Sequence, residues 1–362
     1  MINQTVRVLC VFSSLNRGGA ESMCMNLFRH VNRDKIQFDF VKHTPRRCLF
    51  EDEIESLGGK IYEAPRFNGK NVIAYRKWWK CFLKEHPEYM IIHLHFFTMS
   101  AVISPVAHKM GRKVIGHCHQ HFRVDSIAAA IKKAFIRAGG RAVDYRFACS
   151  DEAGRFMYGK MNFSVIKNAI NINRFRFNSE TRCATRSELG ILNTETAIGT
   201  VGRFSPQKNI DGIIDIIRLL KERETAFKFI WVGEGQLRSH AVSRIKELGL
   251  QDSIIFTGSR PDVDRIMQAM DVFILPSLCE GLGIVNIEAQ ASGLPCFISD
   301  RVTKECDITG KCTFLPVNDA EKWVDAILKA DTKRYDCREQ IKAAGYDIVE
   351  SSKCMEDFYL SI

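Results

Sequence analysis

The sequence of 362 residues lacks the features that would place a protein in a membrane or in an oxidising compartment. It contains no run of 18 apolar residues, and its first segment, MINQTVRVLCVFSS, has the pattern of a strand. We therefore expect neither a membrane-spanning helix nor a signal peptide. The 13 cysteines never form a C-x-x-C pair, and several lie in apolar segments typical of strands, as Cys10 and Cys149 do. This pattern favours buried, reduced thiols in a cytosol.

No recognisable nucleic-acid-binding motif occurs, although the net charge is +10. The positive charge is concentrated in the first half of the chain. Residues 1–170 carry 27 Lys and Arg against 14 Asp and Glu, whereas residues 171–362 carry 25 against 28. The first half would be attracted to an anionic surface or substrate, and nucleic acid or an acidic membrane leaflet could each supply one. Composition does not decide between them.

Apolar strand-like segments alternate with amphipathic helical segments along the whole chain, which predicts doubly wound α/β sheets. The first strand, near residues 6–12, is followed by Gly18 and Gly19 and then a helix, and ligands of such sheets bind at the carboxyl ends of the strands. The alternation restarts after residue 170. A chain of this length also exceeds one typical core. We therefore predict domains at residues 1–170 and 171–345, with a helical segment at 346–362.

One stretch, CEGLGIVNIEAQASGLP at residues 279–295, organises the second half. It follows an apolar strand and would place Glu280 on a glycine-rich turn and Glu288 on the next helix. The free amides of that helix start would favour an anion between the two carboxylates, which describes a seat for a nucleotide sugar. These amides would belong to Gly283, Ile284 and Val285. An ordinary strand, turn and helix with solvated glutamates is the alternative for this stretch alone.

Two further loops of the second half carry charge. Arg203 and Lys208 follow one strand end together, where they could clamp a diphosphate by paired charge. Asp262 and Asp264 form a D-x-D, which in some sugar-transferring enzymes holds a metal ion. Because Pro261 and both aspartates directly precede a helical pattern, we interpret them as a helix N-terminus.

Histidines gather on two predicted neighbouring strands of the first half. His117, His119 and His121 alternate along one strand and would share a face, with His93 and His95 on the next. A zinc site is conceivable, yet no acidic or cysteine ligand follows at a helical spacing such as H-E-x-x-H. A strand-end histidine that faces the cleft as a hydrogen-bonding or proton-shuttling group is better supported.

Two amphipathic helices could meet a lipid surface. The helix at residues 72–85 contains Trp78 and Trp79 among basic residues, and we expect its aromatic side to pack on the sheet. The segment DSIAAAIKKAFIRAGGRAVDYRFACS, a basic helix followed by a strand ending at Ser150, is the better candidate for contact with lipid. A solvated helix face is the alternative. The basic residues of this helix are Lys132, Lys133, Arg137 and Arg141.

The motifs VGRFSPQKN, VGEG, FTGSRPDVDRIMQAMDVFILPS and EGLGIVNIEAQASGLP, in this order, resemble the retaining nucleotide-sugar glycosyltransferases of family 4. SSLNRGGAES and the H-x-H strand extend the resemblance to the first half, whose sequence is most similar to the bacterial capsular and exopolysaccharide branch. The resemblance implies a GT-B fold, in which two Rossmann-like domains face a central cleft. It also implies a C-terminal helix that crosses back to the first domain, so that the cleft could close like a hinge.

The resemblance also implies roles for individual residues. Glu280 would contact sugar hydroxyls, Glu288 the ribose, and Arg203 and Lys208 the diphosphate, while His119 would be the cleft histidine beside sugar and acceptor. Together with His119, the residues expected to act in catalysis are Glu280, Arg203 and Lys208. The donor would be bound by Gly18, Gly19, Arg203, Lys208, Gly233, Glu280, Gly281, Leu282, Gly283, Ile284, Val285 and Glu288.

Two of these positions depart from the family pattern. His117, on the acceptor side with His119, stands where many members have threonine, and Leu282 replaces the commoner phenylalanine.

The activity implied is a retaining, metal-independent hexosyl transfer from a nucleotide sugar, with UDP expected from family frequency. The acceptor would be a glycan, most simply a lipid-linked oligosaccharide at the cytoplasmic face of a bacterial inner membrane. The basic first domain would bind the anionic membrane surface, and no nucleic acid is expected as a partner. Two alternatives are a nucleotide-sugar 2-epimerase of the same fold, which the paired glutamates and the Arg-Lys clamp disfavour, and a scaffold protein without turnover.

Overall fold

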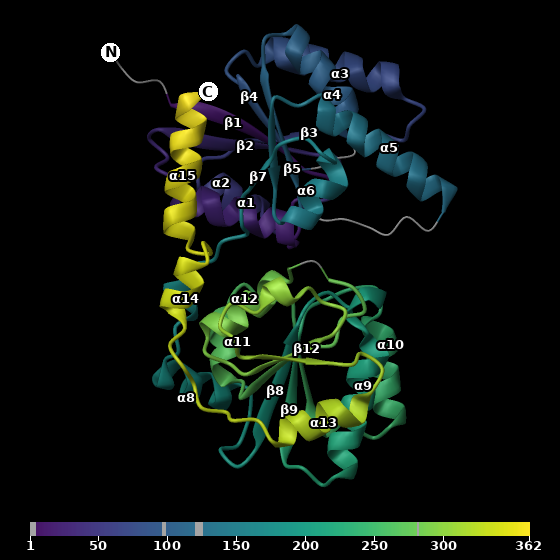
Figure 1. The fold of residues 1–362 in the computed structure, drawn as a ribbon, viewed down its shortest axis with the longest axis vertical. Coiled ribbons are helices and arrows are strands. Elements are labelled where there is room, and N and C mark those ends of the chain that lie inside the picture. Colours follow the sequence, from purple (N-terminus) through teal and green to yellow (C-terminus); the bar gives the residue numbers. More distant parts are fainter. Residues whose placement is uncertain (1–4, 96–98, 120–125, 281) are drawn as a thin grey trace. The chain divides into compact units, whose positions relative to one another are not determined.

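The computed structural model describes residues 5–95, 99–119, 126–280 and 282–362. The chain divides into two compact units. Unit 1 combines residues 1–170 with residues 345–362, and unit 2 consists of residues 171–344. Figure 1 shows a sheet flanked by helices in each unit, with the chain ending in the long helix α15 beside the sheet of unit 1. Each unit therefore contains its own sheet and its own core.

The sheet of unit 1 has seven parallel strands in the order β3-β2-β1-β4-β5-β6-β7. The central strands read as continuous apolar runs because helices cover both faces. The strands are β1 (Val6–Val11), β2 (Ile36–Lys42), β3 (Ile61–Glu63), β4 (Ile91–Leu94), β5 (Lys113–Cys118), β6 (Tyr145–Ala148) and β7 (Ser164–Val165).

Two separate apolar layers pack on this sheet. One lies under α3 (Val72–Glu85), α4 (Ser100–Lys109), α5 (Ile127–Arg141) and α6 (Asp151–Tyr158), where the fully buried Trp79 belongs to the core. The other lies under α1 (Gly19–His30), α2 (Glu51–Ser56) and α15 (Ile348–Ser361). The last helix of the chain thus completes the core of the unit that contains the first strand.

The sheet of unit 2 has six parallel strands in the order β10-β9-β8-β11-β12-β13. They are β8 (Thr196–Val201), β9 (Phe227–Val232), β10 (Ile254–Gly258), β11 (Val272–Leu275), β12 (Cys296–Ser299) and β13 (Cys312–Leu315). The two Rossmann-like parallel sheets confirm the predicted fold class.

The helices of unit 2 form two groups. The first packs on one apolar layer and comprises α9 (Ile210–Glu222), α10 (Arg238–Glu247) and α13 (Ala320–Leu328). The second comprises α7 (Ile172–Phe175), α8 (Ser179–Glu188), α11 (Val263–Ala269), α12 (Ile284–Ala291) and α14 (Arg338–Ala343). Short 3-10 turns lie at Pro206–Lys208, Gln251–Ser253 and Lys304–Cys306. Helices, 3-10 turns or loops thus connect each strand of unit 2 to the next.

Several local predictions need correction. The strand expected to end at Ser150 ends at Ala148, because the Ser150 side chain accepts a hydrogen bond from the Ala153 amide and so begins α6. Cys149 therefore lies just beyond the strand, although it is buried. Helix α4 was not predicted. It contains Pro105, a residue that usually interrupts helices, and carries few charges to mark an amphipathic pattern.

The aromatic side of α3 packs on the sheet as predicted, since Tyr75 and Trp79 are fully buried. All 13 cysteines are free, and most are buried, among them Cys10 and Cys118.

Candidate functional site

The strand order of each unit defines where a ligand would bind. In unit 1 the order reverses between β1 and β4, and in unit 2 it reverses between β8 and β11. The loops that leave the carboxyl ends of two such strands diverge to opposite faces and leave a crevice for ligands. In unit 2 these loops carry the predicted Lys208, after β8, and the predicted Glu280, after β11. In unit 1 the corresponding loops follow β1, with Gly18 and Gly19, and β4, with His95.

Lys208 and Glu280 form an ion pair, with 2.5 Å between Nζ of the lysine and Oε2 of the glutamate. Both side chains are partly buried. The Ser277 hydroxyl donates to the same carboxylate oxygen at 3.4 Å. The Leu278 amide donates to the Gln207 carbonyl at 2.8 Å, which ties the two loops together at the backbone. The structure therefore brings together, at the switch point, two residues 72 positions apart in the chain.

The start of α12 is set by Gly283. This residue is the N-cap and adopts φ 62° and ψ 75°, a left-handed conformation that glycine enters without cost. The helix is then anchored by its inner face, where Ile287 is fully buried and the Asn286 and Gln290 side chains donate to the Cys306 carbonyl at 3.0 and 2.8 Å. The first amides of α12 follow directly, and the predicted helix N-terminus after Glu280 is present.

Glu288 lies one turn into α12 in a different environment from Glu280. Its side chain is partly exposed, yet burial of the carboxyl group raises its pKa to about 8. The Arg174 guanidinium opposes this shift in pKa, and the Asp264 carboxylate adds to it. Glu280 and Glu288 thus have separate charged partners, and the structure records no contact between them among the described residues.

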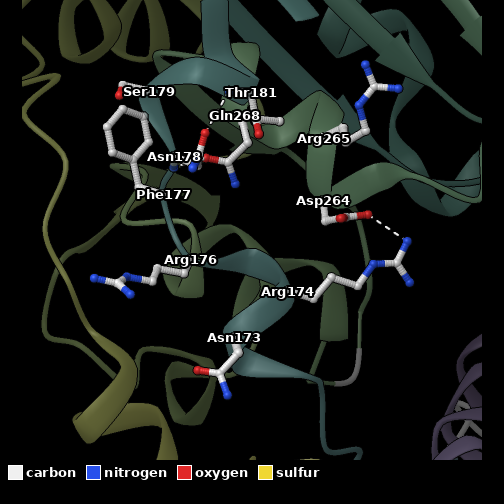
Figure 2. A pocket seen from close by; sticks show the side chains of 10 residues that line it. All are labelled: Asn173, Arg174, Arg176, Phe177, Asn178, Ser179, Thr181, Asp264, Arg265 and Gln268. Atoms are coloured by element: carbon white, nitrogen blue, oxygen red, sulfur yellow. Dashed lines mark hydrogen bonds and ion pairs between the residues drawn. The ribbon is translucent and has the colours of Figure 1, made fainter. Parts of the chain in front are cut away.

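Arg174 and Asp264 also line a pocket of about 570 Å³ at the start of unit 2, shown in Figure 2. The two side chains pair at 2.7 Å, and Arg174 also donates to the Pro261 carbonyl at 2.8 Å. Arg176 and Arg265 also line this pocket, and in Figure 2 their guanidinium groups extend in different directions. Sequence reasoning did not identify Arg174, because it stands alone in a polar connecting segment without a motif.

The D-x-D segment is a helix start, with α11 beginning at Val263 and Asp264 in its first turn. Asp262 occupies the N-cap position but does not cap the helix amides. Its carboxylate instead accepts two hydrogen bonds from Arg260, at 2.7 and 2.8 Å, which holds the pKa of Asp262 below its usual value.

The remaining predicted donor residues differ in how the structure holds them. Gly233 has φ 140°, and a Cβ there would lie 2.0 Å from the Gly202 carbonyl oxygen, so only glycine fits. Gly19 opens α1, and a Cβ there would meet nothing within 4 Å. Arg203 is exposed and has no ion pair within the described part of the chain.

Further members of the predicted set vary in exposure. Gly18 is the N-cap of α1 in an extended conformation. Leu282 and Ile284 are partly exposed, Val285 is buried, and Gly281 lies outside the described residues.

The predicted histidines form a quartet in unit 1, at the ends of β4 and β5. His95 Nδ1 lies 2.9 Å from His119 Nε2, and His117 Nδ1 lies 3.3 Å from His93 Nε2. The two pairs stack, with ring centroids 4.1 Å apart for His93 on His95 and for His117 on His119. The Tyr359 hydroxyl of α15 lies 2.6 Å from His93 Nδ1. The shared face predicted for these histidines is confirmed, and His121 lies outside the described residues.

Burial lowers the pKa of every histidine in the quartet. The pKa is lowered to about 3 for His93 and for His119, and well below the usual value for His95 and His117, where neighbouring imidazoles contribute as well. All four rings are therefore neutral near pH 7.

Two groups of described residues have possible metal-ligand atoms within 4.8 Å of one another. One is His93 with His95 and His117, and the other is Cys10 with Cys24 and His95. Lone pairs of imidazole nitrogens lie in the ring plane, and the rings of His93 and His95 stack with their planes 28° apart. Burial also raises the pKa of Cys10, which disfavours the thiolate that a metal requires.

Two family models match the chain. Residues 182–347 match the model described as "Glycosyl transferases group 1", and residues 17–174 match that described as "Glycosyltransferase Family 4". Among curated proteins, the chain is 31% identical to "Putative glycosyltransferase EpsF" of Bacillus subtilis, over 98% of this chain and 96% of that protein. It is 26% identical to the UDP-Gal:alpha-D-GlcNAc-diphosphoundecaprenol alpha-1,3-galactosyltransferase of Escherichia coli, over 56% and 55%.

Solved structures share the fold at lower identity. The crystal structure of Anabaena Alr3699/HepE in complex with UDP and glucose superposes with a TM-score of 0.78 at 18% identity, covering 98% of this chain and 99% of that one. WaaG, a glycosyltransferase involved in lipopolysaccharide biosynthesis, superposes with a TM-score of 0.71 at 16% identity, covering 98% and 99%. Both likenesses bear on the fold alone.

Proposed function

The chain belongs to the family 4 glycosyltransferases, and on that premise we propose that it transfers a hexose from a UDP-sugar to a lipid-linked glycan with retention of configuration. The observation that carries the proposal is the Lys208–Glu280 pair at the switch point of unit 2, close in sequence to the N-terminus of α12. The UDP and UDP-glucose complexes of the HepE structures support the choice of donor. The undecaprenyl-linked acceptor named for the Escherichia coli relative supports the choice of acceptor.

The pair has a specific part in this mechanism. In the ligand-free state each charge neutralises the other at 2.5 Å. When a donor binds, the Lys208 ammonium would turn to the diphosphate, and the Glu280 carboxylate would be released to accept hydrogen bonds from sugar hydroxyls. Arg203, exposed and without an ion pair to any described residue, would add a second cation. Two cations and the helix amides would then stabilise the charge that develops on the leaving diphosphate, a task for which no metal is required.

The environment of Glu288 suits a neighbouring hydroxyl. A carboxyl group with a pKa of about 8 is largely protonated near pH 7, so it offers both a donor and an acceptor to a ribose diol. Binding of two hydroxyls in this way would orient the nucleoside relative to the diphosphate site.

The donor site is tested by thermal unfolding with UDP-, GDP-, ADP- and dTDP-sugars, with and without EDTA. A ligand at about 100 times its Kd stabilises by about 2.7 kcal/mol, which raises Tm by about 5–10 °C for a unit of this size. We expect UDP-sugars alone to raise Tm, equally in EDTA, and Glu280→Gln to lower the transfer rate between about tenfold and a hundredfold.

The control is Glu222→Gln. Glu222 is the last residue of α9 and pairs with the partly exposed Arg218. Because α9 starts after the carboxyl end of β8 and Glu222 is at its other end, loss of this carboxylate should change neither binding nor transfer. Absence of stabilisation by every nucleotide sugar would contradict the proposal, and stabilisation that EDTA abolishes would contradict its metal-independent form.

Helix α5 supports action at the cytoplasmic surface of a membrane. Ile127, Ile131 and Phe135 follow one another at four-residue spacing and are 82%, 66% and 37% exposed, which is unusual for large apolar side chains. Lys132 and Arg141 are exposed on the same helix, within the unit that holds the excess of positive charge. An anionic lipid surface offers both apolar chains and negative head groups to such a helix. Among the described helices, none is long and apolar enough to cross a membrane.

Co-sedimentation with vesicles tests this surface. The double variant Ile127→Ser with Ile131→Ser should lose binding to vesicles that contain phosphatidylglycerol, and salt should weaken the binding of the unaltered protein. Ile73→Ser is a matched control, because Ile73 lies on α3 of the same unit and is 86% exposed. Equal binding to neutral and anionic vesicles would contradict the proposal.

A further inference from the structure

A hollow of about 520 Å³ lies in unit 1 between the C-terminal half of α5 and the turn that follows α6. It is lined by Arg137 and Arg141 of α5 and by residues 158–161, which include Lys160 and Met161. Among the described residues that line it, none is acidic. Three cationic side chains therefore share one hollow with apolar groups.

The turn that forms one wall is held in place. Tyr158, the last residue of α6, is buried, and its hydroxyl lies 2.6 Å from the Gly116 carbonyl oxygen and 3.0 Å from that of Phe147. Gly159 follows with φ 65°, and a Cβ there would meet nothing within 4 Å. The wall is thus anchored to the sheet, and its outer side is open.

Two of the three cations are not used by the protein itself. Cationic side chains often serve the carbonyl groups at the end of a helix. Arg137 does so, because its Nε donates to the Phe156 carbonyl of α6 at 3.3 Å. Arg141 and Lys160 are exposed, and neither side chain has a hydrogen bond or ion pair to a described residue. These two cations remain available for an external anion.

The hollow lies at one end of the exposed apolar row of α5. At 3.6 residues per turn, Arg141 and Arg137 lie about 40° and about 80° around the helix axis from Ile127, on the side away from Ile131 and Phe135. Arg141 is also about 9 Å further along the axis than Phe135. Helix α5 lies on the outside of unit 1 (Figure 1). Its surface therefore presents apolar side chains that lead to a cationic hollow.

We propose that this hollow binds the phosphate group of one anionic phospholipid, whose acyl chains lie along Ile127, Ile131 and Phe135. The proposal rests on the membrane contact proposed above for α5, and it assigns to that contact a defined head-group site. A guanidinium group can donate two parallel hydrogen bonds to a phosphate, and an ammonium group adds a point charge. A choline head group would bring a further cation against Arg141 and Lys160, so the site favours an anionic lipid.

The test is a calorimetric titration of the full-length protein with dihexanoyl phosphatidylglycerol below its micelle concentration, which offers single lipids and no surface. We expect saturable binding of one lipid. Dihexanoyl phosphatidylcholine should bind about tenfold more weakly because of its choline cation. Inorganic phosphate should also bind at least about tenfold more weakly, because it has no acyl chains. Equal affinity for inorganic phosphate or for phosphatidylcholine would overturn the proposal.

Variants test the two available cations. Arg141→Gln combined with Lys160→Gln should weaken phosphatidylglycerol binding at least about tenfold, through the loss of charged hydrogen bonds. The matched control is Lys109→Gln with Lys113→Gln, which removes the same charge from exposed positions of unit 1 that do not line the hollow. It should change the affinity less than about twofold. All four side chains are exposed, so both double variants should keep the Tm of the unaltered protein. Equal losses in the two variants would show diffuse attraction and overturn the proposal.

These titrations separate the head-group site from the proposed function, because they require neither sugar donor nor acceptor. Sugar transfer by a protein that does not bind the short-chain lipid would remove the head-group site alone. Saturable lipid binding that depends on Arg141 and Lys160, in a protein that transfers no sugar, would remove the proposed function and leave the head-group site.

Discussion

Glu288 shows how a single residue can couple donor binding to pH. Its pKa of about 8 lies well above the ordinary glutamate value of 4.5, chiefly because its carboxyl group is removed from water within α12. The folded protein therefore holds a proton on Glu288 at pH values where the unfolded chain has released it. Stability from this group is fully present below about pH 4.5 and is lost as the pH rises through about 8.

The first prediction concerns the variant Glu288→Gln, which keeps the side-chain shape and cannot ionise. Between pH 5 and pH 9 we expect the Tm of the unaltered protein to fall relative to that of Glu288→Gln. Only the unaltered protein must either keep a proton on Glu288 or bury a negative charge there when it folds. Differential scanning calorimetry at several pH values measures the difference. Parallel pH profiles for the two proteins would show that the carboxyl group is not desolvated.

At the residue scale, the sequence identified Glu280 and Lys208 but not their mutual contact. Both follow strand ends, and residues at the ends of neighbouring parallel strands meet at one edge of the sheet. Arg174 was missed for the opposite reason. It reaches Asp264 from the short helix α7, whose position depends on tertiary packing that no local pattern encodes. The stacking of the histidine pairs was missed too, because strand register, and not composition, brings His95 beside His119.

At the scale of elements, α12 depends on one backbone conformation at its start. Gly283 has φ 62°, where an L-residue costs about 1–2 kcal/mol. An added Cβ would also lie 3.2 Å from Glu280 Cγ and 3.4 Å from Leu275 Cδ2. A side chain at Gly283 therefore strains the start of the helix. It also crowds the side chain of Glu280, whose carboxylate the proposed mechanism uses.

The second prediction compares Gly283→Ala with Gly310→Ala. Gly310 has φ 68°, but a Cβ there would meet nothing within 4 Å, so it carries the same backbone strain without the contact. We expect both variants to lose about 1–2 kcal/mol of unfolding free energy in urea. Only Gly283→Ala should also weaken UDP binding, by calorimetric titration. Equal UDP affinity in the two variants would show that the Glu280 side chain adapts freely.

Elements with strong periodicity were predictable, and those defined by caps or irregular composition were not. The boundaries of α3 at Val72–Glu85 were predicted from its repeated aromatic and basic positions. The end of β6 was misplaced because Ser150 extends an apolar run in sequence while its hydroxyl begins the next helix. Helix α4 escaped notice because Pro105 and an apolar composition hide the amphipathic pattern.

At the scale of the whole molecule, unit 1 is discontinuous in sequence. Its core includes Ile348, Met355 and Tyr359 of α15, which lie against β1, β2 and α1. Tyr359 is nearly fully buried, packs edge-on to Phe38 and lies 2.6 Å from His93. Unit 2, by contrast, is one continuous segment. The last helix therefore stabilises the unit that is most distant from it in the chain.

The third prediction is that removal of residues 345–362 unfolds unit 1 and leaves unit 2 folded. Each of the three buried side chains contributes about 1.5–3 kcal/mol, and their sum of about 5–9 kcal/mol rivals the total stability of a typical domain. Calorimetry of the shortened chain should show one transition with about half the original enthalpy, and UDP should still raise its midpoint.

Tyr359→Phe is the graded control for this truncation. It removes only the hydroxyl near His93 Nδ1 and keeps the packing against Phe38, so it should cost about 1 kcal/mol and preserve both transitions. Two intact transitions in the shortened chain would show that unit 1 folds without α15. Loss of both would show that unit 2 depends on unit 1, because unit 2 itself loses no residue in this truncation.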